Sequence, residues 1–184
     1  MRCFYDPKSH FNLANLVTMA NITMGLIAAY LIVHHQFAMA AGFAWLGGAF
    51  DILDGKIARK YGLSNPFGVQ LDSFADFLSF VLVPVFFIFE GIYESLDGMT
   101  FFLASVVSVY YVISGLRRLI QFNLDASPGT VGKYFVGVPT PLGAILLWLV
   151  WLLAVYGVLS PSLVMVAMVV IGWLLNSDVK VPHP

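Results

Sequence analysis

The chain has 184 residues, of which 60% are apolar and only 10% are charged, with nine Lys and Arg residues against ten Asp and Glu residues. Soluble domains carry about a quarter charged residues, so this composition excludes a water-soluble globular domain. The near-neutral charge also excludes a basic protein that binds nucleic acid, and the single cysteine, Cys3, excludes an internal disulfide. The composition therefore predicts an all-α, polytopic membrane protein with one domain covering residues 1–184.

Six apolar segments follow one another along the chain, each close to the length of about 20 residues that a transmembrane helix needs. Polar and turn-forming residues separate them, and no repeat or linker interrupts the order. The last segment, which begins near Pro161, is the shortest. We expect the six helices at residues 12–33, 37–58, 69–90, 99–120, 139–157 and 159–176.

The positive charges predict how these helices are oriented. With six spans, all nine basic residues fall on one side: the amino terminus, the second-to-third and fourth-to-fifth connections, and the carboxyl-terminal tail. Basic loops stay in the cytoplasm, so we expect both termini to be cytoplasmic and the protein to be integral to the cell membrane. The nine are Arg2, Lys8, Lys56, Arg59, Lys60, Arg117, Arg118, Lys133 and Lys180.

Four carboxylates lie where a bilayer disfavours them, near the cytoplasmic ends of the second and third segments: Asp51, Asp54, Asp72 and Asp76. Their spacings of three and four residues place each pair on one helix face, and the two helices are consecutive and antiparallel. A central Asp costs about 2.5–3.5 kcal/mol to insert, and four converging carboxylates repel one another. Hard divalent cations relieve that repulsion. The pattern predicts two ions, Mg²⁺ or Mn²⁺, about 3.5–4 Å apart, with Ca²⁺ as a non-productive occupant.

Small residues and an arginine accompany the acids on the second helix. Gly55 and Ala58 leave a shallow groove beside the carboxylates, and Arg59 supplies a donor fork suited to phosphate. Together they indicate a substrate that carries pyrophosphate, such as a nucleotide-activated lipid. Two alternatives stay open at this point: ordinary polar residues at helix ends, or an Asp relay in an ion- or proton-coupled transporter.

The spacing of these residues resembles the signature of the CDP-alcohol phosphatidyltransferases: Asp51-x2-Asp54-Gly55-x2-Ala58-Arg59-x8-Gly68-x3-Asp72-x3-Asp76. The resemblance implies one metal held by Asp51, Asp54 and Asp72 and a second held by Asp51, Asp72 and Asp76. It implies that Asp76 is the general base, and that Gly55, Ala58 and Arg59 contact the nucleotide and its phosphates. It also implies a homodimer.

The first helix is similar to the family's first helix, which lies beside the nucleotide. It reads Asn15-x2-Thr18-x2-Asn21-x3-Gly25. The resemblance implies nucleotide contacts from Asn15 and Thr18, and with less weight from Asn21. The alternative is helix–helix packing, in which such residues are common.

The fourth-to-fifth connection resembles the phosphatidylserine synthase branch. Its basic and amide residues precede the run Phe135-Val136-Gly137-Val138-Pro139-Thr140-Pro141, and one position departs from the branch, with Gln121 where Arg is usual. The resemblance implies transfer of a phosphatidyl group from CDP-diacylglycerol to L-serine, with release of CMP. Other acceptors stay open (an inositol phosphate, a glycerol phosphate or another amino alcohol), as does an archaeal ether-lipid donor. The candidate acceptor-binding residues are Arg117, Arg118, Gln121, Asn123 and Lys133.

Overall fold

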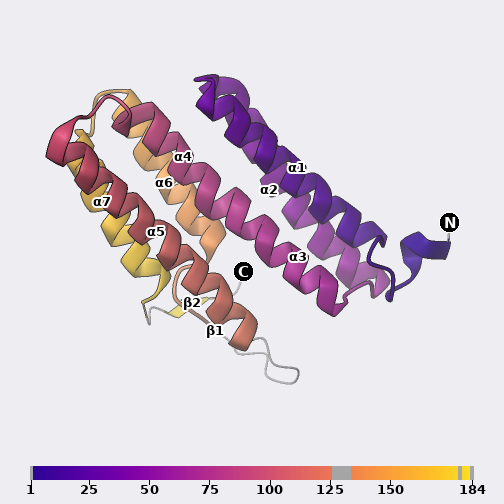
Figure 1. Ribbon diagram of the computed structural model, residues 1–184. Helices are drawn as coiled ribbons and strands as arrows, with labels where there is room; N and C mark the ends of the chain where they lie inside the picture. Colours follow the sequence, from indigo (N-terminus) through magenta and orange to yellow (C-terminus); the bar gives the residue numbers. More distant parts are fainter. Residues whose placement is uncertain (1, 126–133, 178–179, 183–184) are drawn as a thin grey trace. The chain divides into compact units, whose positions relative to one another are not determined.

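The computed structural model describes residues 2–125, 134–177 and 180–182 (Figure 1). Regular structure in these residues is helical, apart from two strands of three residues each. The helical fold predicted from the sequence is therefore confirmed. The chain forms two compact units, Met1–Ser79 and Phe80–Pro184.

Among the described residues, four helices are long and apolar enough to cross a membrane: Leu13–Val33, Phe37–Tyr61, Pro66–Tyr93 and Gly98–Asp125. Two further apolar helices, α6 (Thr140–Val155) and α7 (Pro161–Leu175), have 16 and 15 residues. At 1.5 Å per residue they are about 24 Å long, which is less than the roughly 30 Å of a bilayer core. These apolar helices indicate an integral membrane protein.

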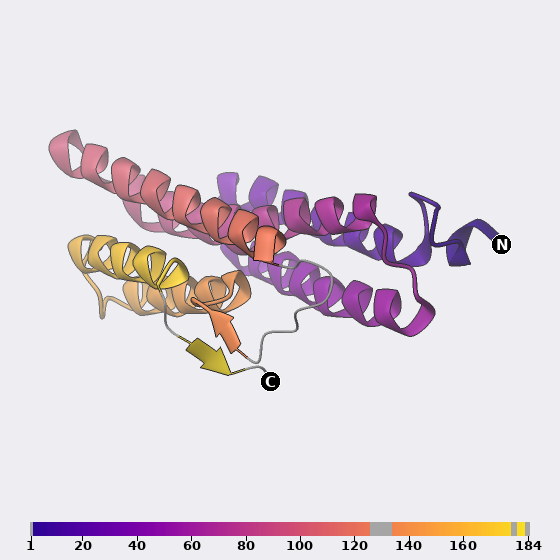
Figure 2. The same ribbon diagram turned by 90° about the horizontal axis from the view of Figure 1, so that it is seen from below.

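The first unit is a helical hairpin with a third helix against it. Helices α1 (Leu13–Val33) and α2 (Phe37–Tyr61) pack along their lengths, and α3 (Pro66–Asp76) packs on α1 (Figures 1 and 2). Gly47 of α2 faces Asn21 of α1 so closely that an added Cβ would lie 3.0 Å from Asn21 Oδ1. Small residues permit this approach of two membrane helices.

Capping residues set the ends of these helices, and they explain why the observed bounds differ from the predicted ones. Gly62 has a φ of +62° directly after α2, so this helix continues to Tyr61 rather than stopping at residue 58. Asn65 caps α3 through Gly68 N–H, and Pro66 occupies the first turn. That helix therefore begins at residue 66 rather than 69.

The third apolar stretch is one continuous helical run with two wider turns. After α3 come the π-helical segment η2 (Phe77–Leu82), α4 (Val83–Ile88) and a second π-helical segment, η3 (Phe89–Tyr93). Pro84 lies just after η2; proline has no N–H to donate and crowds the carbonyl four residues before it. Single π-helical turns accommodate such a break and recur at functional sites.

The second unit holds α5 (Gly98–Asp125), α6 and α7, with α7 packed against both of the others. Two strands, β1 (Tyr134–Val136) and β2 (Lys180–Pro182), pair antiparallel with Phe135 opposite Val181 (Figure 2). The sequence did not predict this ribbon. Its strands are too short for a period of two to be recognised, and 43 residues (137–179) lie between them in the sequence.

Candidate active site

The carboxylates of the second and third helices converge in the first unit. Asp51 and Asp54 lie on α2, and Asp72 and Asp76 lie on α3. One carboxylate oxygen from each of Asp51, Asp72 and Asp76 lies within 4.8 Å of the others. This carboxylate triad is the set that the resemblance assigns to one of its two metals. Asp54 is not part of the triad and is 4% exposed.

Two buried carboxylate oxygens here have no hydrogen-bond partner within the described part of the chain: Asp54 Oδ2 and Asp76 Oδ1. Asp76 also lies against Asp51. Buried anionic oxygens without donors are costly, and a divalent cation satisfies several of them at once. The donor set, all carboxylate oxygen, suits a hard ion such as Mg²⁺ or Mn²⁺. The residues present therefore fit a divalent cation.

A pocket of about 190 Å³ opens beside the triad, between α1, α2 and the start of α3. Five of the six residues predicted to contact the nucleotide line it: Asn15, Thr18, Gly55, Ala58 and Arg59. Asp54 and Asp72 also line it, so the pocket and the carboxylates share a wall. It can hold an anionic group between an arginine and the carboxylate cluster.

Two glycines keep the pocket open. A Cβ on Gly68 would lie 2.5 Å from Asn15 Oδ1, a distance that real side chains do not adopt. A Cβ on Gly55 would lie 3.6 Å from the Arg59 guanidinium, in ordinary contact with it. Gly68 therefore permits the close approach of α3 to α1, and Gly55 leaves the surface next to Arg59 uncovered.

The three polar residues of α1 have different partners. Asn15 Nδ2 donates to His10 O at 3.1 Å, and the Thr18 hydroxyl donates to Ala14 O at 3.2 Å while lying against Asp54. Asn21 does not line the pocket; its Oδ1 accepts a hydrogen bond from Ser79 Oγ at 2.8 Å. The first two are thus placed to meet a ligand, whereas Asn21 joins two helices.

Ser64 and Asn65 also line the pocket, and sequence reasoning missed both. Their signal was the order Asn65-Pro66 followed by Gly68, which is typical of a capped helix start. This pattern predicts the start of a helix, and nothing in it indicates that the loop also contacts a ligand.

The candidate acceptor-binding residues lie on α5 in the second unit, apart from Lys133, which lies outside the described residues. Arg118 is buried and donates from Nε to Val138 O at 3.1 Å and from Nη2 to Gly137 O at 3.5 Å. Gln121 is exposed and donates to Asp125 Oδ1 at 2.9 Å. Arg117 is exposed and Asn123 is half-buried. Arg118 therefore has a packing role within its own unit.

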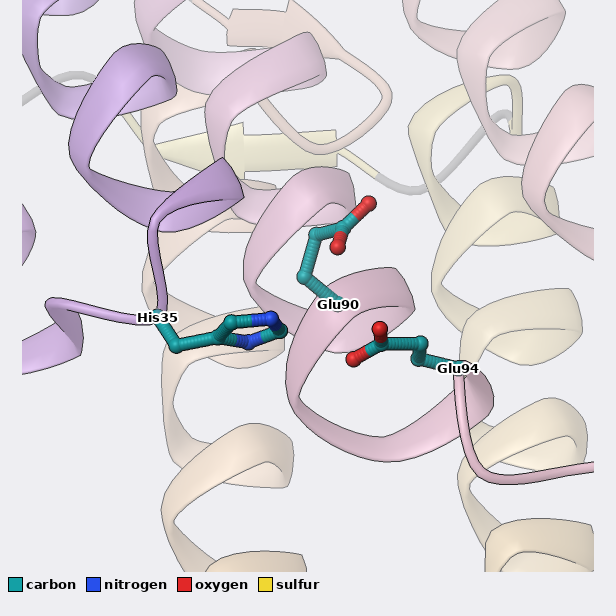
Figure 3. Close-up of side chains that lie close together, drawn as sticks. All are labelled: His35, Glu90 and Glu94. Carbon is teal, nitrogen blue, oxygen red and sulfur yellow. The ribbon is translucent and has the colours of Figure 1, made fainter.

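A second pair of carboxylates lies at the far end of the third helical run. Glu90, in η3, and Glu94, directly after it, have carboxylate oxygens within 4.8 Å of one another (Figure 3). The sequence placed both on the side of the membrane opposite to the basic loops.

Comparison with known proteins agrees with this geometry. The sequence profile described as CDP-alcohol phosphatidyltransferase matches residues 11–175. The chain is 29% identical to CDP-diacylglycerol–serine O-phosphatidyltransferase of Bacillus subtilis, over 91% of this chain and 88% of that protein. It is 32% identical to the Methanocaldococcus jannaschii protein of the same name, over 97% and 77%, and 29% identical to archaetidylserine synthase of Methanothermobacter thermautotrophicus, over 95% and 71%.

The profile covers nearly the whole chain, and the residues that carry the family signature gather around one pocket. The transporter alternative has no comparable support. The chain is a phosphotransferase that belongs to the CDP-alcohol phosphatidyltransferase family.

Proposed function

We propose that this enzyme transfers a phosphatidyl group from CDP-diacylglycerol to the hydroxyl of L-serine, giving phosphatidylserine and CMP. The observation that best supports this reaction is the carboxylate triad next to a pocket lined by Arg59. The observation that favours serine is that relatives similar over most of this chain are named for serine as acceptor.

The nucleotide half of the donor occupies the pocket. Its phosphates meet the Arg59 guanidinium, which donates in a planar fork. Asn15 and Thr18 contact the nucleoside from the α1 side, and Gly55 and Ala58 let it approach the α2 backbone. These contacts hold the β-phosphorus next to the carboxylates.

The acceptor oxygen then attacks that phosphorus. Its new bond to phosphorus forms as the bond from phosphorus to the CMP oxygen breaks, and CMP leaves with the electron pair. Asp76 takes the proton from the serine hydroxyl, because an alcohol is a weak nucleophile at neutral pH. Arg59 balances negative charge on the departing phosphate.

Asp51, Asp72 and Asp76 would hold one divalent cation, and Asp51, Asp54 and Asp72 a second one. Such ions, when bound, stabilise charge on the attacking and leaving oxygens. In this proposal the carboxylates of all four residues are bound to cations or protons, which removes their mutual repulsion.

The site faces the cytoplasm in our proposal, with both termini on that side and six spans in the cell membrane. The support is the positive-inside distribution of the nine basic residues. Arg117, Arg118, Gln121, Asn123 and Lys133 stay candidates for the serine site, and a homodimer is the proposed assembly.

The test is an assay of purified protein in detergent with CDP-diacylglycerol, Mg²⁺ or Mn²⁺ and a panel of acceptors. We expect CMP release with L-serine and none after EDTA treatment, with recovery on adding Mn²⁺. CMP release with glycerol phosphate or inositol phosphate instead would show that the enzyme has the reaction of the family but a different acceptor. No release with any acceptor would contradict the proposal.

One further donor belongs in that assay, because one similar protein is named archaetidylserine synthase. The proposed pocket contacts are all with the nucleotide half of the donor and do not distinguish ester from ether tails, so a CDP-activated ether lipid is tested alongside the ester lipid. A kcat/KM higher for the ether lipid would assign that donor class.

A further inference from the structure

The amino-terminal segment (Pro7–Asn12) runs beside the nucleotide pocket and is joined to it by asparagine side chains. Asn12 caps α1, with its Oδ1 accepting from Asn15 N–H at 3.0 Å, and its Nδ2 donates to Leu63 O at 3.0 Å. Asn12 is fully buried. The start of α1 is thereby fixed against the loop that leads into α3.

Asn65 makes the second connection. Its Nδ2 donates to Pro7 O at 2.8 Å and to Ser9 O at 3.2 Å, while its Oδ1 accepts from Gly68 N–H at 2.7 Å. One side chain therefore holds both the amino-terminal segment and the first turn of α3. Asn65 and Gly68 also line the pocket.

The segment in turn orients Asn15. Because Asn15 Nδ2 donates to His10 O, its carbonyl oxygen is left facing Gly68 and the pocket. An acceptor is thus presented at a fixed place, where amine or hydroxyl donors of a nucleoside can meet it. Without this hydrogen bond, the side-chain amide of Asn15 could turn and present either its oxygen or its nitrogen to the ligand.

Apart from the buried Asn12, the segment is largely exposed, and hydrogen bonds join it to the residues around the pocket. The ring of His10 stacks on Phe67 with centroids 4.5 Å apart, but Pro7, Lys8 and His10 are exposed and border a hollow beside α3. Because few side chains before Asn12 are buried, loss of the Asn65 bonds should loosen residues 7–11.

We propose that Asn65 is a positioning residue for the nucleotide: by holding the amino-terminal segment on α3, it keeps Asn15 oriented toward the ligand. This inference rests on the proposed function, since it takes the ligand of the pocket to be a cytidine nucleotide. Asn65 acts through Asn15 and does not contact the reacting atoms.

The deciding variant is Asn65→Asp. A carboxylate still accepts from Gly68 N–H and caps α3, but it cannot donate to Pro7 O or Ser9 O and is repelled by both. We expect the dissociation constant for CMP, measured by calorimetry on the full chain in detergent, to rise about tenfold. The KM for CDP-diacylglycerol should rise in parallel, with kcat within about twofold of the parent.

The matched control is Ser160→Asp, which places the same carboxylate at the cap of α7, where Ser160 Oγ accepts from Leu163 N–H. Its CMP affinity should equal that of the parent. An Asn65→Asp variant with parental CMP affinity and KM would overturn the proposal. So would a variant whose kcat falls while its KM stays unchanged.

Hydrogen exchange on the parent protein gives a measurement that needs no variant. Because the segment orients Asn15 through His10 O, CMP bound to Asn15 should stabilise the segment and slow amide exchange in residues 8–12. Unchanged exchange at a saturating CMP concentration would overturn the proposal. Failure of the proposed function looks different, because the parent itself would then neither bind CMP nor release it from CDP-diacylglycerol.

Discussion

Asp76 contacts Asp51 on one side and keeps a buried oxygen, Oδ1, without a hydrogen-bond partner in the described residues. A carboxylate in this state is suited to accept a proton or to bind a cation. Removing its charge should therefore stop the chemistry while leaving the pocket of Arg59 and Asn15 in place.

We expect Asp76→Asn to lower kcat by at least about a hundredfold, the usual minimum for loss of a general base. Binding of CMP, measured by calorimetry, should stay within about threefold of the parent, since Asp76 does not line the pocket. The control is Asp97→Asn, an exposed acid outside the site, with parental kcat. Parental turnover in Asp76→Asn would exclude it as the base.

Gly68 offers a second test at the scale of one side chain. In Gly68→Ala the new methyl group would lie 2.5 Å from Asn15 Oδ1, so Asn15 or α3 must shift. We expect the KM for CDP-diacylglycerol to rise at least about tenfold. Gly42→Ala, in the second turn of α2, is the matched control, because none of the described atoms lies within 4 Å of the added Cβ. Equal KM values for both variants would show that the approach of α3 to α1 has no role in binding.

At the scale of elements, the buried Ser79–Asn21 hydrogen bond joins α1 to the π-helical segment η2. Ser79 follows Asp76 by three residues, and both partners are buried, at 7% and 0% exposure. A hydrogen bond away from water holds two helices in register, and Gly47 gives Asn21 the room to make it.

Ser79→Ala should therefore disturb the placement of Asp76 more than the nucleotide pocket. We expect kcat to fall by about threefold to tenfold with KM for CDP-diacylglycerol unchanged. Ser108→Ala serves as the control, since Ser108 is similarly buried but donates to Ala104 O within its own helix. A KM effect without a kcat effect would assign Asn21 to the nucleotide after all.

The end of α5 gives another test at this scale. Arg118 donates to the carbonyls of Val138 and Gly137, directly before α6. Gly137 has a φ of +85°, and a Cβ there would lie 2.8 Å from Leu175 O, so the arginine stabilises a turn that only glycine can form. Arg118→Met leaves those carbonyls without a donor.

We expect Arg118→Met to lower the free energy of unfolding by about 1–3 kcal/mol, seen as a lower Tm in thermal denaturation. Arg118→Lys should restore part of it, because one ammonium can reach one carbonyl. An unchanged Tm together with a raised KM for serine would instead place Arg118 in the acceptor site.

For the whole molecule, the distribution of charge predicts the orientation in the membrane. In a Cys3→Ser background, Lys60→Cys and Asp97→Cys place one thiol at each end of the helices, at exposed positions. Because basic loops remain in the cytoplasm, a membrane-impermeant maleimide should label the first only in inverted vesicles and the second only in right-side-out vesicles. Labelling of both from one side would contradict the six-span arrangement.

The sequence by itself determined the helical membrane class and the residues that gather at the pocket. Asp51 and Asp54, like Asp72 and Asp76, share a face because three or four residues make one helical turn. A short connection between two helices then brings such faces together. Local spacing was therefore sufficient to place Gly55, Ala58 and Arg59 beside the carboxylates, whereas Asn15 and Thr18 were predicted from the resemblance of the first helix to that of the family.

Only the tertiary structure decided which partners the ambiguous polar residues take. Asn21 continues the spacing of Asn15 and Thr18 but bonds Ser79, 58 residues away, and Arg118 bonds carbonyls about 20 residues away. Asn65 holds a segment 58 residues earlier in the chain. Helical periodicity specifies the face on which a side chain lies, whereas its hydrogen-bond partner depends on how helices distant in sequence pack, which no local pattern encodes.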